Sequence, residues 1–329
     1  MKINCLASPY LFAIGLALPA PAATEIVLWT NMSYPGVSGT LTNLAFVQPA
    51  LNNAGQIGFR AGTTSSAGQA GMFRAEPGTV DQLLFPGDPA LNGSGNFQGF
   101  VDGVMSIDSA GFLTQRGFFQ NSASTSGFIG ADGVGPRVEL RLQAPLPDGN
   151  GSISDGFPMA LGGRSMILAA TIVGSNGGSL DNSAIVTVAA DSSRQLLARE
   201  GQTVPDGNGQ YGNLSGGFVV RNESMQALVT AQVRNTTGGT ADDAGLFRLG
   251  NGGPTVLARK GETTSAGVIA NFIKIALADN GTAAFAGSLS GTADPPNDNG
   301  GVFHTDGTTV TKIARAGEAI PDGTGVVGT

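Results

Sequence analysis

The sequence is poor in the side chains that most often carry protein chemistry. Its 329 residues include one cysteine, Cys5, and one histidine, His304, and only 12% of them are charged. A single histidine excludes metal sites built from several histidines, and we expect no cofactor. Lys and Arg number 17 against 24 Asp and Glu, giving a net charge of −7. This acidic balance argues against nucleic acid or anionic lipid as a partner.

The first two dozen residues have a different character from the rest. Lys2 provides a positive start, Tyr10 to Leu18 is apolar, and small residues follow at 20–23. This pattern predicts a secretory signal peptide over residues 1–23, since the apolar stretch is too short to span a membrane. A retained anchor is the alternative. Cleavage would remove Cys5, so the exported protein would have no disulfide, no cysteine-ligated zinc and no thiol nucleophile.

The remaining composition favours short strands and tight turns. Glycine occupies 52 positions and apolar residues make up 41% of the chain. Glycine suits turns but costs about 1 kcal/mol relative to alanine inside a helix. No segment after the N-terminus keeps the apolar spacing of an amphipathic helix. We therefore expect an all-β protein. The predicted signal peptide would direct it to the periplasm or the extracellular space.

One hexapeptide recurs in the chain. It spans 196–201, 256–261 and 312–317, each time with an Ala-Arg pair and a final Gly. Two further columns support the period: one of phenylalanines separated by 54 to 61 residues, and one of small residues separated by 54 to 59. The first is Phe46, Phe100, Phe157, Phe218 and Phe272; the second is Gly55, Gly111, Ser165, Ser224 and Gly281. A fixed period of this length is typical of a repeat array.

The last complete period predicts four strands. They cover 272–277, 282–288, 302–304 and 310–315. Asp306-Gly307 is a hairpin signal, because both residues of such a turn take positive φ. Four antiparallel strands per period predict a β-propeller-like array of about five four-stranded blades. Another closed or open array of β-sheets is the next alternative.

These periods give the expected domain limits. After the signal peptide, residues 24–329 form a single repeat domain, with blades near 41–86, 97–143, 154–200, 215–260 and 269–316 and partial units at 25–40 and 317–329. Ile26 to Thr30 fits the fourth strand of a blade. We therefore expect an incomplete six-bladed ring, in which an N-terminal strand would pair with missing C-terminal strands. A five-bladed ring with a spare N-terminal strand is the alternative.

A short motif links the chain to a known family. The segment 52–59 (NNAGQIGF) resembles the NxxGxxAF motif of the choice-of-anchor tandem repeat proteins, and 278–285 (ADNGTAAF) keeps its Gly and Ala-Phe. The Pro-Asp-Gly segments at 147–149, 205–207 and 321–323 are also similar to that family. The resemblance implies an exported bacterial repeat protein, often surface-anchored, with no assigned activity. Anchoring here would require a further C-terminal segment.

Arginines at one repeat position are the candidate ligand-binding residues. The position is Phe85 in the first unit and then Arg141, Arg199, Arg259 and Arg315. A ring of guanidinium groups could bind an anionic sugar or a phosphate. The alternative is pairing with the nearby Glu200, Glu262 and Glu318, and exposed pairs of this kind contribute about 0–1 kcal/mol each.

Other motifs favour structural interpretations. The Asp-Gly-Asn-Gly segments at 148–151 and 206–209, and residues 294–298, are similar to calcium loops but lack the later acidic ligands. We interpret them as turns and expect no metal site. The GxGxxG at 207–212 has no surrounding βαβ unit. His304 matches Arg74 and Arg248 in earlier units, which indicates a solvated strand end.

Function follows only in outline from these patterns. The main hypothesis is a non-enzymatic exported module that binds an unknown extracellular protein or a glycan. The alternative is a secreted polysaccharide hydrolase or lyase with acidic residues at the axial opening, and no catalytic residue stands out among the 24 acids. Acids from several blades within about 10 Å of one another would favour the enzyme.

Overall fold

A computed structural model describes residues 13–14, 26–28, 30–35, 37–44, 49–66, 70–90, 95–101, 105–121, 124–134, 138–161, 164–217, 219–250, 252–295, 297–320 and 325–328. Nearly all of the predicted signal peptide lies outside these ranges, as do Phe46, Phe218 and the segment 321–323. The described part is all-β, as predicted, with helical turns only in short 3-10 segments such as η3 (Gly178–Leu180) and η4 (Gly239–Ala241). No helix in this part is long and apolar enough to cross a membrane.

The chain divides into two compact units, residues 1–139 and 140–329. In the first unit β1 (Ala13–Ile14) pairs with β2 (Ile26–Val27). Sheet 1 contains β3 (Leu41–Leu44), β4 (Ala50–Leu51), β5 (Ile57–Thr63), β6 (Ala70–Glu76) and β7 (Thr79–Leu84). Sheet 2 contains β8 (Asn96–Phe100), β9 (Ser106–Ile107), β10 (Leu113–Gln120), β11 (Ser126–Ala131) and β12 (Val138–Arg141). The 3-10 turn η1 (Thr64–Ser66) follows β5.

The second unit contains the three later sheets. Sheet 3 is formed by β13 (Ser152–Leu161), β14 (Ser165–Val173), β15 (Ser183–Val188) and β16 (Arg194–Arg199). Sheet 4 has β17 (Gln210–Tyr211), β18 (Val219–Arg221), β19 (Gln226–Arg234), β20 (Ala244–Gly250) and β21 (Thr255–Arg259). Sheet 5 has β22 (Thr263–Thr264), β23 (Gly267–Leu277), β24 (Ala283–Ser290), β25 (Gly300–Thr305) and β26 (Val310–Arg315).

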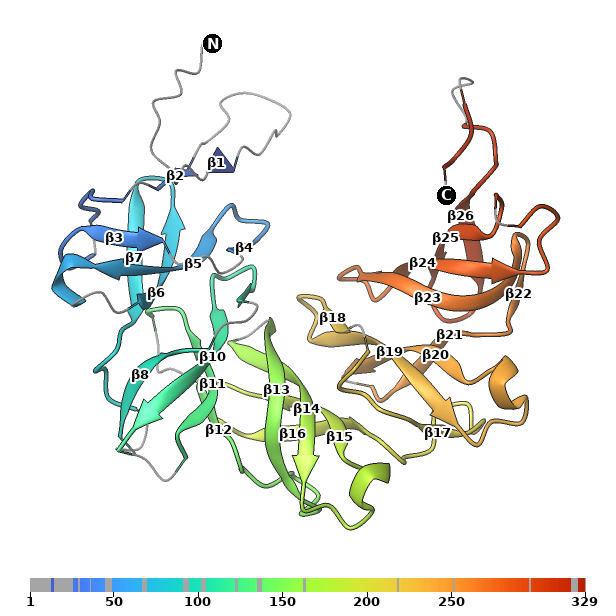
Figure 1. Cartoon of the computed structure of the whole chain (residues 1–329), viewed down its shortest axis with the longest axis horizontal. Helices are drawn as coiled ribbons and strands as arrows, with labels where there is room; N and C mark the ends of the chain where they lie inside the picture. The colour runs from blue at the N-terminus through green and yellow to red at the C-terminus, as the bar shows by residue number, and fades with distance from the viewer. Residues whose placement is uncertain are drawn as a thin grey trace. The chain divides into compact units, whose positions relative to one another are not determined.

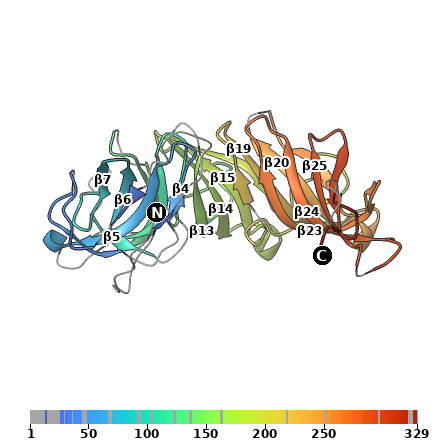
Figure 2. The ribbon, with the colours of Figure 1, turned by 90° about the horizontal axis from the view of Figure 1, so that it is seen from above.

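Each sheet is antiparallel and its main strands follow one another in sequence order, as the repeat predicts (Figure 1). Figure 2 shows this order clearly for β23, β24 and β25, whose ribbons run side by side. The first strand differs from the prediction in sheets 1, 2 and 4. There two short strands, such as β17 and β18, pair with the same neighbour. Glycines between them, at 212, 216 and 217, favour this interruption, because they weaken a continuous strand.

The phenylalanine column does not mark the starts of strands, although the sequence predicted a strand that begins at Phe272. Phe100 ends β8, while Phe157 and Phe272 lie inside β13 and β23. Their surroundings also differ, since Phe157 is 64% exposed and Phe272 only 5%. The pairing register shifts after Ile153 in β13 and after Ile269 in β23. Bulges of this kind move following side chains to the other face of the sheet, so a sequence column need not be a structural one.

The second column of the sequence analysis, that of small residues, is wrong in two repeats. The shared feature is a residue with positive φ at the turn before the second main strand. It is Gly55, Gly111 and Gly281 in three sheets, with φ of 77°, 86° and 83°. In the other two it is Arg164 and Met225, with φ of 60° and 59°, one position away from the expected serine in sheet 3 and in sheet 4. The backbone conformation is retained where glycine is not, at a cost of roughly 1–2 kcal/mol per residue.

The Asp306-Gly307 turn is longer than the two-residue hairpin expected. Thr305 pairs with Val310, so four residues form the loop. Gly307 has a φ of 100°, whereas Asp306 accepts hydrogen bonds from the backbone N–H and hydroxyl of Thr308 at 2.8 and 2.6 Å. The aspartate therefore stabilises the turn through its side chain instead of adopting positive φ.

Asparagine side chains join consecutive sheets at these turns. Asn222 accepts a hydrogen bond from the N–H of Gln226 at 2.9 Å and donates through Nδ2 to the carbonyl of Ala278, in sheet 5, at 2.8 Å. Asn52 donates in the same way to the carbonyl of Asp108, in sheet 2, at 2.7 Å. One amide therefore fixes its own turn with its oxygen and holds the next turn with its nitrogen.

Arginines of the third strand add a second link of this kind. Arg248 donates to the carbonyl of Gly281 at 2.8 Å, and Arg74 donates to the carbonyl of Gly111 at 3.4 Å. Arg74 also pairs with Asp81 at 2.6 Å. The matching residue in sheet 5, His304, is exposed near the end of β25. The sequence therefore described His304 correctly but missed that the two arginines connect repeats.

Apolar side chains between consecutive sheets form the core. In the second unit Leu228 and Leu246 of sheet 4 share one buried cluster with Phe285 and Phe303 of sheet 5. The two phenylalanine rings stack, with centroids 5.1 Å apart. In the first unit another cluster contains Phe59 and Phe73 together with residues of the segment 28–44. Full burial of one such side chain stabilises the fold by about 1.5–3 kcal/mol, so each sheet depends on the face of its neighbour.

Replacing Asn222 tests the link between sheets 4 and 5. N222A should lower the free energy of unfolding by about 2 kcal/mol, because it leaves buried donors and acceptors unpaired. N222D should cost less, since a carboxylate retains the acceptor for the turn, as Asp108 does in sheet 2. Urea unfolding followed by circular dichroism measures both. Because N222D keeps the acceptor and loses only the donor, a variant N222D as stable as the wild type would show that the contact with Ala278 contributes nothing.

Candidate functional site

The predicted arginines lie at the ends of the fourth strands. Arg199 ends β16, Arg259 ends β21, Arg315 ends β26 and Arg141 ends β12. These are edge strands of their sheets, and after β12, β16 and β21 the chain continues into the next sheet. The equivalent Phe85 in sheet 1 is buried.

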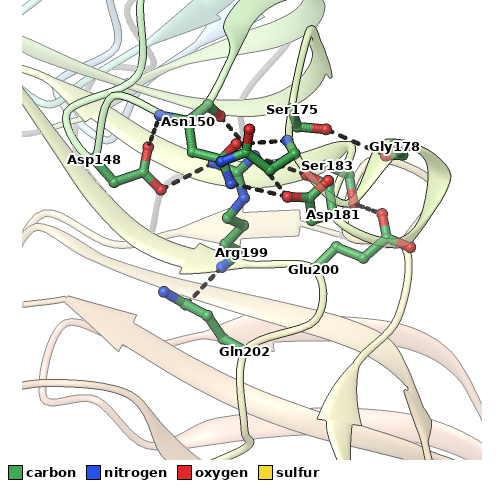
Figure 3. A network of polar contacts seen from close by, with 10 residues as sticks. Asp148, Asn150, Ser175, Gly178, Asp181, Ser183, Arg199, Glu200 and Gln202 are labelled. Carbon is green, nitrogen blue, oxygen red and sulfur yellow. Dashed lines mark hydrogen bonds and ion pairs between the residues drawn. The ribbon is translucent and has the colours of Figure 1, made fainter.

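Arg199 lies at the centre of a polar network (Figure 3). Its guanidinium donates to the Asp148 carboxylate at 2.9 Å and to the carbonyls of Asn150 and Asp181 at 2.7 and 3.0 Å. Asn150 in turn donates to the Asp181 carboxylate at 2.9 Å and accepts from the N–H of Asn176 at 2.7 Å. The side chain of Arg199 is only 5% exposed. This arginine therefore fixes the loop that enters sheet 3 and the loop between β14 and β15.

Arg259 makes the same contacts one repeat later. It donates to both carboxylate oxygens of Asp206 at 2.9 and 3.1 Å and to the carbonyl of Asn208 at 2.6 Å. Asn208 donates to Asp242 at 2.7 Å and accepts from the N–H of Thr237 at 2.8 Å. The Asp-Gly-Asn-Gly segments are thus turns whose aspartate and asparagine bind an arginine, which is the reason for their recurrence.

Arg315 retains part of this arrangement. It donates to the carbonyl of Ala266 at 3.1 Å, and its Nε lies 3.9 Å from the Glu318 carboxylate. The loop entering sheet 5 has no Asp-Gly-Asn-Gly segment. Arg141 is half-buried. The structure therefore places the four arginines at the ends of four different strands. Both terminal nitrogens of Arg199, and Nε and Nη2 of Arg259, donate to the chain's own oxygens.

Of the three glutamates expected to pair with the arginines, Glu318 does so, with Arg315, whereas Glu200 pairs with another arginine. Glu200 is buried and pairs with Arg234, and it accepts a hydrogen bond from the Ser183 hydroxyl at 2.8 Å. Glu262 and Glu318 accept from the backbone N–H of Arg259 and Arg315 at 3.1 and 3.2 Å. The acceptor three residues after each arginine therefore holds the end of the strand, as Gln202 does for Arg199 at 2.9 Å.

Two aspartates of these networks have lowered pKa values. Burial of the Asp181 carboxyl raises its pKa, but hydrogen bonds from Ser175, Asn150 and the backbone of Gly177, with the charge of Arg199, lower it below its ordinary value overall. Hydrogen bonds from Thr236 and Asn208 lower the pKa of Asp242 despite its desolvation. The surrounding hydrogen-bond donors therefore stabilise the charged form of each carboxyl, as is typical of aspartates with a structural role.

The described residues contain no group of three His, Cys, Asp or Glu side chains that could hold a metal ion. The two Asp-Gly-Asn-Gly turns direct their oxygens to arginines, as described above. The GxGxxG segment at 207–212 lies in the turn that precedes β17 and in β17 itself.

A surface hollow between sheets 4 and 5 was not predicted from the sequence. It has a volume of about 460 Å³, within the range of small-molecule sites. Its lining comes from the connection between β17 and β18 and from β19, β20 and β23, and consists of Asn213, Gly216, Gly217, Thr230, Ala231, Gln232, Ala244, Asn271 and Phe272. A Cβ on Gly217 would lie 2.1 Å from the carbonyl of Thr230, so glycine allows this connection to approach β19. No periodic signal marks these residues, because they meet only through the packing of two sheets.

Two asparagine amides of the hollow have fixed orientations. Oδ1 of Asn213 accepts from the N–H and hydroxyl of Ser215 at 2.8 and 2.9 Å and from the N–H of Gly216 at 3.1 Å. Oδ1 of Asn271 accepts from the N–H of Phe272 at 2.9 Å. Each amide oxygen is therefore engaged by backbone, and Nδ2 is the group that can donate to a ligand. The lining has amides, a hydroxyl and apolar groups, but no ionisable side chain.

Comparison with known proteins identifies a family. Residues 108–328 match the model of a family of unknown function (DUF7453), so the chain belongs to that family. No curated protein matches it.

Several solved structures share a low similarity with the chain. Trypanosoma rangeli sialidase in complex with sialic acid is 11% identical, with a TM-score of 0.39 over 94% of this chain and 53% of the sialidase. An ulvan lyase bound to its saccharide is 7% identical, with 0.36 over 81% and 68%. The α-L-arabinanase of Penicillium chrysogenum is 14% identical, with 0.35 over 86% and 84%. The chain spans about half the length of the sialidase, and TM-scores this low carry no argument about function.

Removing the guanidinium of Arg199 should destabilise the second unit. R199A leaves Asp148 and Asp181 without their cation, and breaking a buried ion pair from one side costs about 3–5 kcal/mol. R194A is the matched control, because Arg194 donates to the carbonyl of Pro145 at an exposed site and should cost less than about 1 kcal/mol. Thermal and urea unfolding measure the difference. Equal stability of the two variants would contradict a structural role for Arg199.

Stability should decrease in acid. A carboxyl with a lower pKa in the folded chain stabilises the fold above its unfolded-state pKa of about 3.9, and this stabilisation is lost as the pH falls through the folded value. Asp181 and Asp242 therefore predict a decline in the free energy of unfolding below about pH 4. D242N should make that decline shallower, whereas N235A, which changes no carboxyl, should leave its slope unchanged. An unaltered slope in D242N would contradict the shift at Asp242.

Proposed function

We propose that this protein is an exported, non-enzymatic binding module that recognises a neutral carbohydrate in the hollow between sheets 4 and 5. The observation that carries the proposal is the chemistry of the lining. Fixed amide donors on Asn213 and Asn271 and the exposed amide of Gln232 match the paired hydroxyl groups of a sugar. The half-buried Ala244 offers a small apolar surface for its C–H groups.

The charge of the hollow supports this ligand class. An anionic sugar would need a cationic partner, and the lining residues carry no ionisable side chain. The predicted arginines make their described contacts with the chain itself, as shown for Arg199 and Arg259. Binding of a neutral saccharide through hydrogen bonds is therefore the function that the geometry favours.

The proposal includes export and a propeller arrangement. The N-terminal pattern that predicts a signal peptide supports delivery outside the cytoplasm. Within the second unit, sheet 4 shares its buried apolar faces with sheets 3 and 5, as blades of a propeller do. A wall built from two consecutive sheets would then form the carbohydrate site.

Polysaccharide cleavage is the second candidate function. The hollow provides no carboxyl pair, which glycoside hydrolysis requires in most families. The same binding experiment distinguishes the two functions, because reducing ends appear only if the chain cleaves its ligand.

Binding should be measured by calorimetry with neutral gluco-, xylo-, manno- and arabino-oligosaccharides. We expect one of these classes to bind, and N213A and N271A each to weaken binding at least fivefold, since each removes a hydrogen-bond donor worth about 1 kcal/mol. Q195A is the control, because Gln195 is an exposed amide in β16, outside the hollow.

Two results would reject the proposal. The first is unchanged affinity in both asparagine variants while the wild type binds; the second is binding confined to anionic saccharides. Release of reducing ends from any of the probes would favour the hydrolase or lyase.

A further inference from the structure

A chain of buried hydrogen bonds joins sheet 3 to the connection between β17 and β18. The hydroxyl of Ser183, the first residue of β15, donates to the Glu200 carboxylate at 2.8 Å (Figure 3), and Glu200 pairs with Arg234 of β19. Ser183 is 0% exposed and Glu200 3%. Because the hydroxyl proton points to the carboxylate, the oxygen of Ser183 can accept. It accepts the N–H of Leu214 at 2.8 Å, so sheet 3 holds the connection that carries Asn213.

One position of the repeat carries an Asp or Asn in sheets 3, 4 and 5. It lies two residues after Ile153, Tyr211 and Ile269, whose carbonyls accept equivalent backbone N–H groups at 2.6, 2.8 and 2.8 Å, and its occupants are Asp155, Asn213 and Asn271. In sheets 3 and 5 this side chain binds the N–H of the next residue. Asp155 accepts from Gly156 at 2.7 Å and Asn271 accepts from Phe272 at 2.9 Å. Asn213 is the exception, because Ser183 already binds the N–H of the residue that follows it.

The turn that Asn213 forms instead lines the hollow. Its Oδ1 accepts from the N–H groups of Ser215 and Gly216 at 2.8 and 3.1 Å, and Asn213 and Gly216 both belong to the lining. An amide oxygen has two lone pairs, so this turn and the N–H of Leu214 compete for it. The hydroxyl of Ser183 removes the competition, although Ser183 itself lies outside the lining.

Sheet 4 carries Ala244 where sheet 3 carries Ser183. Each is the first residue of the third main strand, and the carbonyl of each accepts the N–H of the residue after a fourth-strand arginine, at 2.9 and 3.0 Å. Ala244 lines the hollow and has no hydroxyl to offer to Phe272. The N–H of Phe272 is therefore bound by Asn271. The residue at this position of the preceding sheet thus decides how each asparagine of the hollow is oriented.

We propose that Ser183 is a positioning residue of the hollow, whose hydroxyl binds the N–H of Leu214 and thereby fixes the amide of Asn213 for a ligand. The inference rests on the proposed carbohydrate function for the identity of that ligand, whereas the orientation of Asn213 is a property of the ligand-free chain. Without the hydroxyl, Asn213 would bind the N–H of Leu214, as its equivalents in sheets 3 and 5 bind the next N–H, and would release its turn.

Solvent exchange of backbone amides in the ligand-free chain, measured by NMR, tests the orientation. In S183A the N–H groups of Ser215 and Gly216 lose their side-chain acceptor and should exchange about fivefold faster or more. The N–H of Leu214 gains that acceptor and should stay protected, whereas general weakening of the core would accelerate its exchange as well. S179A is the matched control, because Ser179 is an exposed serine in η3 and its loss should change none of the three rates.

Calorimetry with neutral gluco-, xylo-, manno- and arabino-oligosaccharides tests the consequence for binding. S183A should weaken binding about threefold or more. N213A should then cost less than about twofold in the S183A chain, against about fivefold or more in the wild type, because both changes remove the same oriented amide. A serine that only stabilised the fold would leave the effect of N213A unchanged.

If S183A does not fold, A244S tests the same rule at the next pair of sheets. The added hydroxyl should bind the N–H of Phe272 and release Asn271. The side-chain amide resonances of Asn271 should then shift, and N271A should lose its effect on binding. A276S is the control, because Ala276 is an exposed alanine of β23 outside the hollow.

Unchanged exchange at Ser215 and Gly216 in S183A overturns the inference, and so does an equal cost of N213A with and without the serine. Where A244S is the variant used, unchanged resonances of Asn271 overturn it. Absence of binding to every oligosaccharide rejects the carbohydrate function instead, and the exchange rates still decide whether Ser183 positions Asn213.

Discussion

The structure depends on burial of both faces of small antiparallel sheets. A sheet of four or five short strands cannot form a core alone, so its apolar side chains need a neighbouring sheet. In the second unit sheet 4 supplies Val229 and Phe247 to the cluster with sheet 3, and Leu228 and Leu246 to the cluster with sheet 5. This requirement explains why only 12% of the residues are charged. It also explains why the apolar residues do not form long runs.

Polar side chains align the sheets once the apolar faces have met. Asn52 and Asn222 connect the turns of consecutive sheets, and Arg199 and Arg259 fix the loops by which the chain enters a sheet. These contacts are directional, whereas apolar packing is not. The aspartates whose pKa values are lowered lie in the loops that these entry loops contact, between β14 and β15 and between β19 and β20. Repetition of a motif here reflects repetition of a structural contact, and the hollow that we propose as the ligand site involves instead the irregular connection between β17 and β18.

Prediction from the sequence succeeded where local chemistry decides the result. The repeat period and its glycine-rich turns predicted the order of the main strands within each sheet. Prediction was wrong where register matters. Both β13 and β23 shift register before the phenylalanine, but Phe157 lies two residues after the shift and Phe272 one, so Phe157 is exposed and Phe272 is buried. Arg164 and Met225 hold a glycine-like backbone conformation that their side chains do not reveal.

By itself the sequence determined the all-β class, the period and the places where the chain turns, because these follow from the preferences of neighbouring residues. Only the tertiary structure decided which face each side chain occupies and which residues meet across sheets. Their shared repeat position suggested that the arginines form a ring around a ligand. In the structure Arg199 instead pairs with Asp148, 51 positions away in the sequence. The hollow joins Asn213 to Asn271 across two sheets. Such contacts depend on bulges and on sheet packing, which no local pattern encodes.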